Sequence, residues 1–64
     1  MIIEEYRDVI LEETDQLDRY GLPIYIVSNG TKVKAFANGE LAYTDALRYY
    51  NDTVMWLVYG YNRR

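Results

Sequence analysis

Apolar residues near the start of the chain recur at helical spacing. Between residues 2 and 20 they fall mostly three or four positions apart, at Ile3, Tyr6, Ile10, Leu17 and Tyr20. This spacing predicts an amphipathic helix, because side chains three and four residues apart share one helix face. Gly21 and Pro23 follow at once and favour the end of that helix.

Four carboxylates gather on the opposite face of this predicted helix: Glu4, Asp8, Glu12 and Asp15. Leu11 falls at the edge of the acidic face, where it could anchor a basic protein partner. The plainer interpretation is a solvated face that keeps the protein dispersed. Glu13 falls inside the apolar face, and an unpaired buried carboxylate is costly. We therefore expect Glu13 either at a rim that reaches water or in a polar contact across a dimer interface.

Two runs in which alternate residues form separate sets follow between residues 22 and 37, on either side of an Asn29-Gly30 pair. Asn-Gly between two alternating runs is the strongest short-range signal of a β-hairpin. A two-residue Asn29-Gly30 loop would pair Ile26 with Val33, Ile24 with Ala35 and Leu22 with Ala37, forming one apolar face. The other face would show Tyr25, Val27, Lys32, Lys34 and Phe36 to the outside.

A second Asn-Gly pair, at residues 38 and 39, predicts another turn and a short third strand over residues 40–43. Thr44 is then a suitable helix N-cap, and Asp45 suits the positive end of the helix dipole.

The last segment contains a further apolar stripe at spacings of three and four: Leu47, Tyr50, Val54, Leu57 and Tyr61. The stripe predicts a second helix facing the chain's own core, ending at Gly60, with Arg63 and Arg64 near the negative end of the dipole. Residues 53–59 also have the β-branched and aromatic content of a strand, so a strand there is the alternative.

Four large side chains fall outside that stripe: Tyr49, Met55, Trp56 and Tyr59. A helix that is apolar nearly all round is normally buried, and a chain this short cannot surround one with its own residues. These residues either complete the monomer core, form a homodimer interface, or bind another protein. Trp, Tyr and Met are enriched at the cores of interfaces.

Together these elements predict an α+β fold: a small α-β-β-(β)-α unit, with an antiparallel hairpin or three-stranded sheet and two helices on one face. The 64 residues form a single small interaction domain over positions 1–64. A domain of this size has marginal stability, and because cysteine is absent, oligomerisation is the expected reinforcement.

The composition excludes much chemistry. With no His and no Cys, the chain lacks imidazole acid–base catalysis, thiol nucleophiles and Cys/His zinc sites. Ser28 is the only serine and has no histidine to activate it. We therefore expect no enzyme, no catalytic residue, no metal and no cofactor.

Charge is unevenly distributed within the net −3. Residues 1–20 hold seven acids and two bases, a net of −5, whereas residues 21–64 hold three acids and five bases, a net of +2. Such sorting influences association more than fold. No signal-peptide pattern and no membrane-length apolar run occurs, so a cytoplasmic location without membrane contact is expected.

The predicted outer hairpin face offers an alternative function. Tyr25, Lys32, Lys34 and Phe36 resemble, in composition only, the aromatic and basic platforms that stack single-stranded bases. The acidic net charge opposes this, because the electrostatic part of nucleic-acid affinity needs cations.

The leading expectation is a small acidic protein that acts by stoichiometric binding to a macromolecule, as a homodimer. Its acidic segment would suit a basic nucleic-acid-binding protein, since a row of carboxylates can imitate phosphates. Compact, acidic, tyrosine-rich chains of this kind suit phage or mobile-element inhibitors of host nucleic-acid enzymes. A nucleic-acid-binding module and a structural subunit of a larger assembly are the alternatives.

Overall fold

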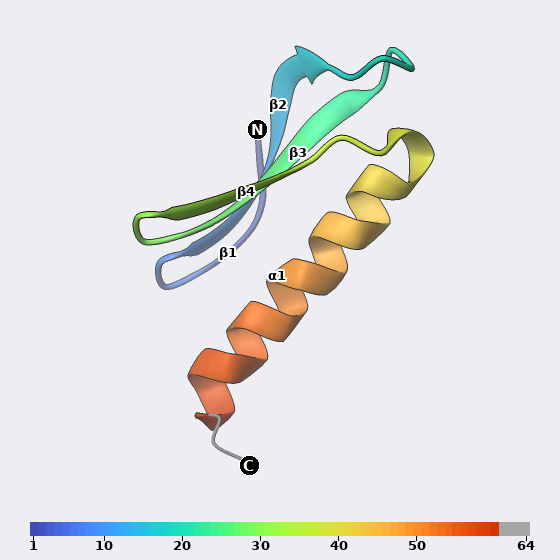
Figure 1. Cartoon of the computed structure of the whole chain (residues 1–64). Helices are drawn as coiled ribbons and strands as arrows, with labels where there is room; N and C mark the ends of the chain where they lie inside the picture. Colours follow the sequence, from blue (N-terminus) through green and yellow to red (C-terminus); the bar gives the residue numbers. More distant parts are fainter. Residues whose placement is uncertain (61–64) are drawn as a thin grey trace.

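The computed structural model describes residues 1–60, which form one antiparallel sheet of four strands packed against a single long helix (Figure 1). The strands are β1 (Ile2–Tyr6), β2 (Val9–Leu17), β3 (Pro23–Asn29) and β4 (Lys32–Phe36). A 3-10 turn, η1 (Gly39–Leu41), leads into the helix α1 (Ala42–Tyr59). The strand order is β1-β2-β3-β4, so each strand pairs with its neighbour in sequence. The α+β class is confirmed, but the described chain has one helix, not two.

The predicted first helix is wrong, because residues 2–17 form a hairpin instead. Tyr6 pairs with Val9 across a tight turn at Arg7 and Asp8. Val9 and Leu11 are both fully buried beneath α1. Alternate residues of a strand share one face, whereas residues two apart on a helix diverge by about 200°. Only a strand therefore buries both.

The second hairpin is confirmed, but its predicted register is wrong by two residues. Asn29 belongs to β3 and pairs with Lys32, so the loop is Gly30-Thr31 rather than Asn29-Gly30. Ile26 consequently pairs with Ala35, not Val33. Gly30 takes φ +65° and is the one position of this loop that needs a left-handed backbone. A glycine at the first loop position is typical of a two-residue hairpin turn.

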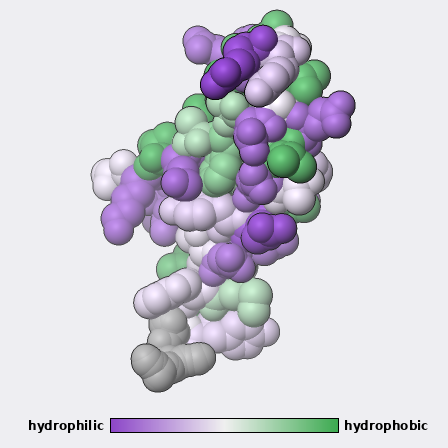
Figure 2. All heavy atoms as spheres, turned by 45° about the vertical axis from the view of Figure 1, so that its right-hand side comes forward, coloured by the Kyte–Doolittle hydropathy of each residue, from purple (hydrophilic) through white to green (hydrophobic). Residues whose placement is uncertain are grey.

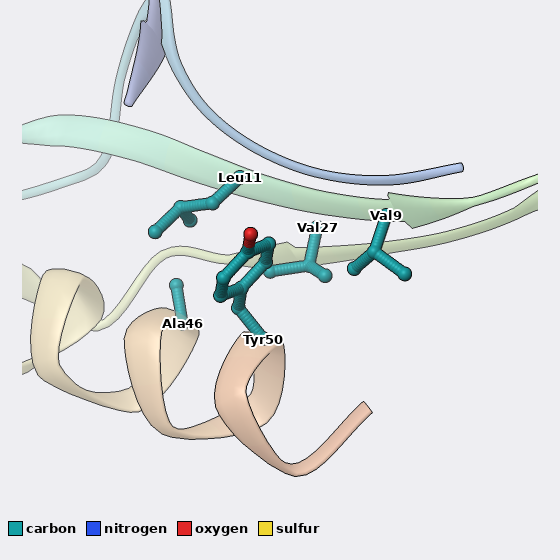
Figure 3. Close-up of a cluster of buried hydrophobic side chains, with 5 residues drawn as sticks. All are labelled: Val9, Leu11, Val27, Ala46 and Tyr50. Carbon is teal, nitrogen blue, oxygen red and sulfur yellow. The ribbon is translucent and has the colours of Figure 1, made fainter. Parts of the chain in front are cut away.

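The face that meets the helix is also the reverse of the predicted one. Val27 is buried under α1, and Tyr25 and Phe36 pack against the same cluster. Figure 3 shows Val9, Leu11 and Val27 pointing from the strands toward Ala46 and Tyr50 of α1. The face changed because β2, rather than a helix, supplies the partners of Val27: Leu11 lies directly opposite it in the sheet.

The predicted third strand over residues 40–43 is wrong. Asn38 and Gly39 do turn the chain, with Gly39 at φ +58°, but into η1 and α1. Leu41 is the N-cap of α1, without a side-chain hydrogen bond, so Thr44 does not cap it. Asp45 lies in the first turn, as predicted.

The helical prediction for residues 53–59 is confirmed over the alternative strand. Gly60 ends α1 with φ +68°, and its N–H donates to the carbonyl of Trp56. The predicted roles of Tyr61, Asn62, Arg63 and Arg64 concern positions outside the described residues.

Asp18 connects the β2–β3 loop to the turn that precedes α1. One carboxylate oxygen accepts hydrogen bonds from the N–H groups of Tyr20 (2.8 Å) and Leu22 (3.0 Å), and the other from Gly39 (2.8 Å). These bonds hold the pKa of Asp18 below its usual value, the one from Leu22 most strongly, against partial burial that raises it. The β2–β3 loop and the start of η1 are thereby held together.

Candidate interaction surface

Only the first part of α1 is buried against the sheet. Its buried residues, Ala42, Ala46 and Tyr50, all lie in the first half, and Val54 is the last residue that packs against the core cluster. In Figure 1 the final turns, coloured orange to red, lie beyond the sheet. The molecule is accordingly elongated, with extents of 39 × 20 × 17 Å.

We call residues 55–59 the helix end. All five side chains are apolar or aromatic and all are exposed: Met55 by 55%, Trp56 by 66%, Leu57 by 41%, Val58 by 48% and Tyr59 by 75%. Five successive residues occupy the full circumference of a helix. No single contact with the sheet could therefore bury them all. In Figure 2 the lower end of the molecule, beside the grey atoms, is pale and green rather than deep purple.

A groove of about 510 Å³ runs between β4 and the second half of α1. We call it the hairpin–helix groove. Lys32 and Lys34 line it from β4, and Tyr49, Asp52 and Trp56 line it from the helix. Apolar rings, two cations and one carboxylate thus share a single concave surface next to the helix end.

The wall of this groove is a compact cation–aromatic cluster. The Lys34 Nζ lies 5.8 Å from the ring centroids of both Phe36 and Tyr49, whose own centroids are 5.6 Å apart. These distances suit cation–π attraction and tilted ring packing. The cluster connects β4 to α1 and fixes the groove's width at that point.

The groove brings together residues that the sequence assigned to two different surfaces. Tyr49 and Trp56 came from the predicted interface, and Lys32 and Lys34 from the predicted nucleic-acid face. The other members of that face do not point outward: Tyr25 and Phe36 are half-buried against the core. Met55 and Tyr59 belong to the helix end.

The predicted acidic face is not assembled. Because residues 2–17 are strands, Glu4 lies opposite Leu11 on the helix side of the sheet, and Glu12 lies opposite Ile26 on the other side. Asp8 is in the β1–β2 turn, and Asp15 lies in the irregular part of β2. Leu11 is fully buried in the core, so its predicted role as an exposed anchor is wrong.

Glu13 is half-buried and lies opposite Tyr25 in the β2–β3 ladder. Burial raises the pKa of Tyr25, and the nearby Glu13 carboxylate and Tyr43 raise it further. The Tyr25 and Tyr43 rings are 5.5 Å apart. Glu13 therefore lies beside Tyr25, whose ring contacts Tyr43 in the first turn of α1, and not at the helix end.

Tyr50 has a comparable environment at the centre of the core. Burial raises the pKa of Tyr50, and the charges of Glu4 and Glu5 on β1 raise it further. The carboxylates of β1 thus influence the hydroxyl group of Tyr50 on α1.

The sequence did not predict a second apolar surface, on the face of the sheet opposite α1. Ile10, Ile24 and Ile26 are half-buried there, and Val33 is 66% exposed. The sequence identified Ile24, Ile26 and Val33 as one apolar face, but it placed the opposite face of the hairpin outside, and α1 covers that opposite face instead.

Within residues 1–60, no group of three or more acidic residues is arranged to hold a metal ion. No helix in the same residues is sufficiently long and apolar to span a membrane. Comparisons with protein-family models, curated protein sequences and solved structures gave no match to this chain.

Proposed function

We propose that this protein is a protein–protein interaction module that acts by stoichiometric binding, with the helix end as the centre of its interface and a second copy as its first partner. One observation carries the proposal: Met55, Trp56 and Tyr59 are more than half exposed on a regular helix. Aromatic residues and Met dominate interface cores, and contiguous apolar patches on a monomer mark binding sites.

The hairpin–helix groove supports the same proposal. It continues the helix end on the Trp56 side and adds Tyr49 with two lysines. An apolar centre bordered by charged groups is the usual composition of an interface, in which the rim remains polar. Contact through the helix end of each copy would produce a closed dimer, since the same patch serves both molecules.

Trp56, the only tryptophan, provides the measurement. Sedimentation equilibrium at high salt should give a dimer that dissociates on dilution, and the emission of Trp56 should move to longer wavelength as its ring becomes exposed to water. The double variant Met55→Ala with Tyr59→Ala should weaken the dimer at least tenfold, because anchors of this kind contribute more than 1 kcal/mol each. Leu17→Ala is the matched control, since Leu17 is 60% exposed but lies on β2. A monomer with unchanged emission at every concentration would contradict the homodimer.

A second candidate function is binding of single-stranded nucleic acid in the hairpin–helix groove. It is favoured by the proximity of Lys32 and Lys34 to the rings of Tyr49 and Trp56. Two lysines on a chain of net charge −3 give a small electrostatic contribution. Titration with a fluorescent oligonucleotide at low salt is the test, with Lys32→Glu expected to abolish any binding. Absence of binding at low salt removes this candidate.

A further inference from the structure

The two edge strands of the sheet match each other in length and oppose each other in charge. Both β1 (Ile2–Tyr6) and β4 (Lys32–Phe36) contain five residues. The central residue is Glu4 in β1 and Lys34 in β4. The strand order leaves β1 and β4 at opposite edges of the described sheet.

The two central charges lie on the same face of the sheet. Glu4 is opposite Leu11, and Lys34 is opposite Val27. Leu11 and Val27 are themselves paired and are both buried under α1. Directly opposed residues share a face, so Glu4 and Lys34 are both on the helix side. The Lys34 contact with Tyr49 of α1 places it there independently.

The directions of the strands are also compatible. In a meander of four antiparallel strands, the first and last run in opposite directions. A second copy in the same orientation therefore brings its β1 antiparallel to β4 of the first. The ladder of β1 is irregular between Ile2 and Glu4, so the part of β1 that can continue the sheet is the regular part, residues 4–6.

We propose that β4 of one molecule pairs with β1 of a second copy, in an antiparallel ladder that places Lys34 opposite Glu4. In this register the regular part of β1, residues 4–6, faces residues 32–34 of β4, and Lys32 lies opposite Tyr6. Pairing by strand addition draws affinity from main-chain hydrogen bonds and specificity from the opposed side chains.

Charge selects this pairing over the symmetric ones. Antiparallel pairing of β4 with another β4 in full overlap would place Lys34 opposite Lys34, and pairing of β1 with β1 would place Glu4 opposite Glu4. Like charges directly opposite destabilise a ladder. The contact is therefore head-to-tail, and such contacts extend into chains or rings of copies. This distinguishes it from contact through the helix end, which closes at a dimer.

Charge reversal provides the test, with sedimentation velocity over a range of concentrations at low salt. We expect wild-type species larger than a dimer that shrink at high salt, because exposed charges are then screened. Glu4→Lys and Lys34→Glu should each weaken this association about tenfold. An equimolar mixture of the two variants should recover it, since the acidic β4 of one then meets the basic β1 of the other.

The matched controls are Glu40→Lys and Arg48→Glu, which make the same charge changes at exposed positions outside both edge strands. Lys32→Glu replaces Lys34→Glu if loss of the contacts of Lys34 with Phe36 and Tyr49 perturbs folding, as judged by circular dichroism. Amide hydrogen exchange of β1 and β4 should slow as concentration rises. A wild type that never exceeds a dimer overturns the proposal and assigns the lysines to protection of an open edge. A mixture that fails to recover association also overturns it.

Discussion

The two halves of α1 have similar apolar content and opposite surroundings. In the first half, residues 42–50, the small side chains of Ala42 and Ala46 let the helix approach the sheet, and Tyr50 fills the space between. In the second half, residues 51–59, the large side chains of the helix end are exposed. The size of the side chains and the reach of the sheet, not hydrophobicity alone, divide the buried part of the helix from its exposed part.

The largest expected effect on the free energy of unfolding is in the core beneath the first half of α1. Leu11→Ala should lower the free energy of unfolding by about 2–5 kcal/mol, because it leaves a cavity against Ala46 and Tyr50. The matched change is Leu57→Ala in the helix end, where Leu57 is partly exposed and the loss should stay below about 1 kcal/mol. Urea denaturation of both variants measures the difference. Equal losses would mean that the two halves of α1 are equally packed.

A substitution in α1 can also disrupt the close packing of its first half against the sheet. Ala46→Leu should cost about 1–3 kcal/mol, because a fully buried alanine leaves no room for three more carbons. Ala35→Leu makes the same change at an exposed position of β4 and should have little effect. Thermal unfolding of the pair provides the measurement, and a tolerated Ala46→Leu would indicate an unfilled space under α1.

The free energy of unfolding at alkaline pH should depend on the buried tyrosines. The pKa of Tyr50 is raised in the folded state. Its contribution to the free energy of unfolding is therefore complete at pH values below the usual pKa of 10.0, and it is lost as the pH rises above that value. Tyr50→Phe should remove this loss, and adding Tyr25→Phe should flatten the limb further, since the pKa of Tyr25 is raised too. Denaturation at a series of pH values above neutrality is the measurement. An unchanged slope in both variants would contradict the assignment.

The sequence predicted α1 and the second hairpin correctly because each carries a strong local signal. The helical stripe continues through Leu47, Tyr50 and Val54, and Gly60 ends it. The hairpin has glycine where φ must be positive. Its register was wrong because an Asn-Gly pair does not specify which of its residues begins the loop.

The first hairpin was misread because its turn carries no such signal. Arg7 takes φ +55°, a conformation rare for arginine, and the turn contains no glycine. Leu11 and Glu13 were the two exceptions to the helical pattern, and both are explained by a strand, since Val9, Leu11 and Glu13 then alternate on one face. Residues 9–13 do not alternate in the sequence, because Val9, Ile10 and Leu11 form one apolar run before two acids, and such a run does not distinguish a strand from a helix.

The groove could not be predicted because it is built from two elements whose packing depends on the side of the sheet that α1 covers. Local alternation assigned Lys34 and Phe36 to one face of the hairpin correctly, but it placed that face outward. The approach of Tyr49 to these residues depends on β2 burying Val9 and Leu11 on the same side. Surface residues were therefore found, but their grouping was not.

A smaller effect is expected where Asp18 fixes the start of α1. Because hydrogen bonds lower the pKa of Asp18 when folded, its stabilising contribution is present above the usual value of 3.8 and is lost as pH falls below it. Asp18→Asn should reduce this acid-dependent loss while keeping one acceptor oxygen. Acid titration of stability measures it, with Asp15→Asn as the exposed control. An identical acid limb in wild type and Asp18→Asn would contradict the proposed anchoring.

The smallest effect marks the point at which α1 stops packing against the core. Val54 packs against the core, whereas its neighbour Met55 is exposed. Val54→Ala should cost about 1 kcal/mol, and Met55→Ala should change stability by less than about 0.5 kcal/mol, because alanine keeps the helix and no buried contact is lost. Met55→Ala should nevertheless weaken the dimer in sedimentation equilibrium. A residue that matters for association but not for folding is the expected property of the helix end, and a large loss of stability at Met55 would move the boundary of the core toward Tyr59.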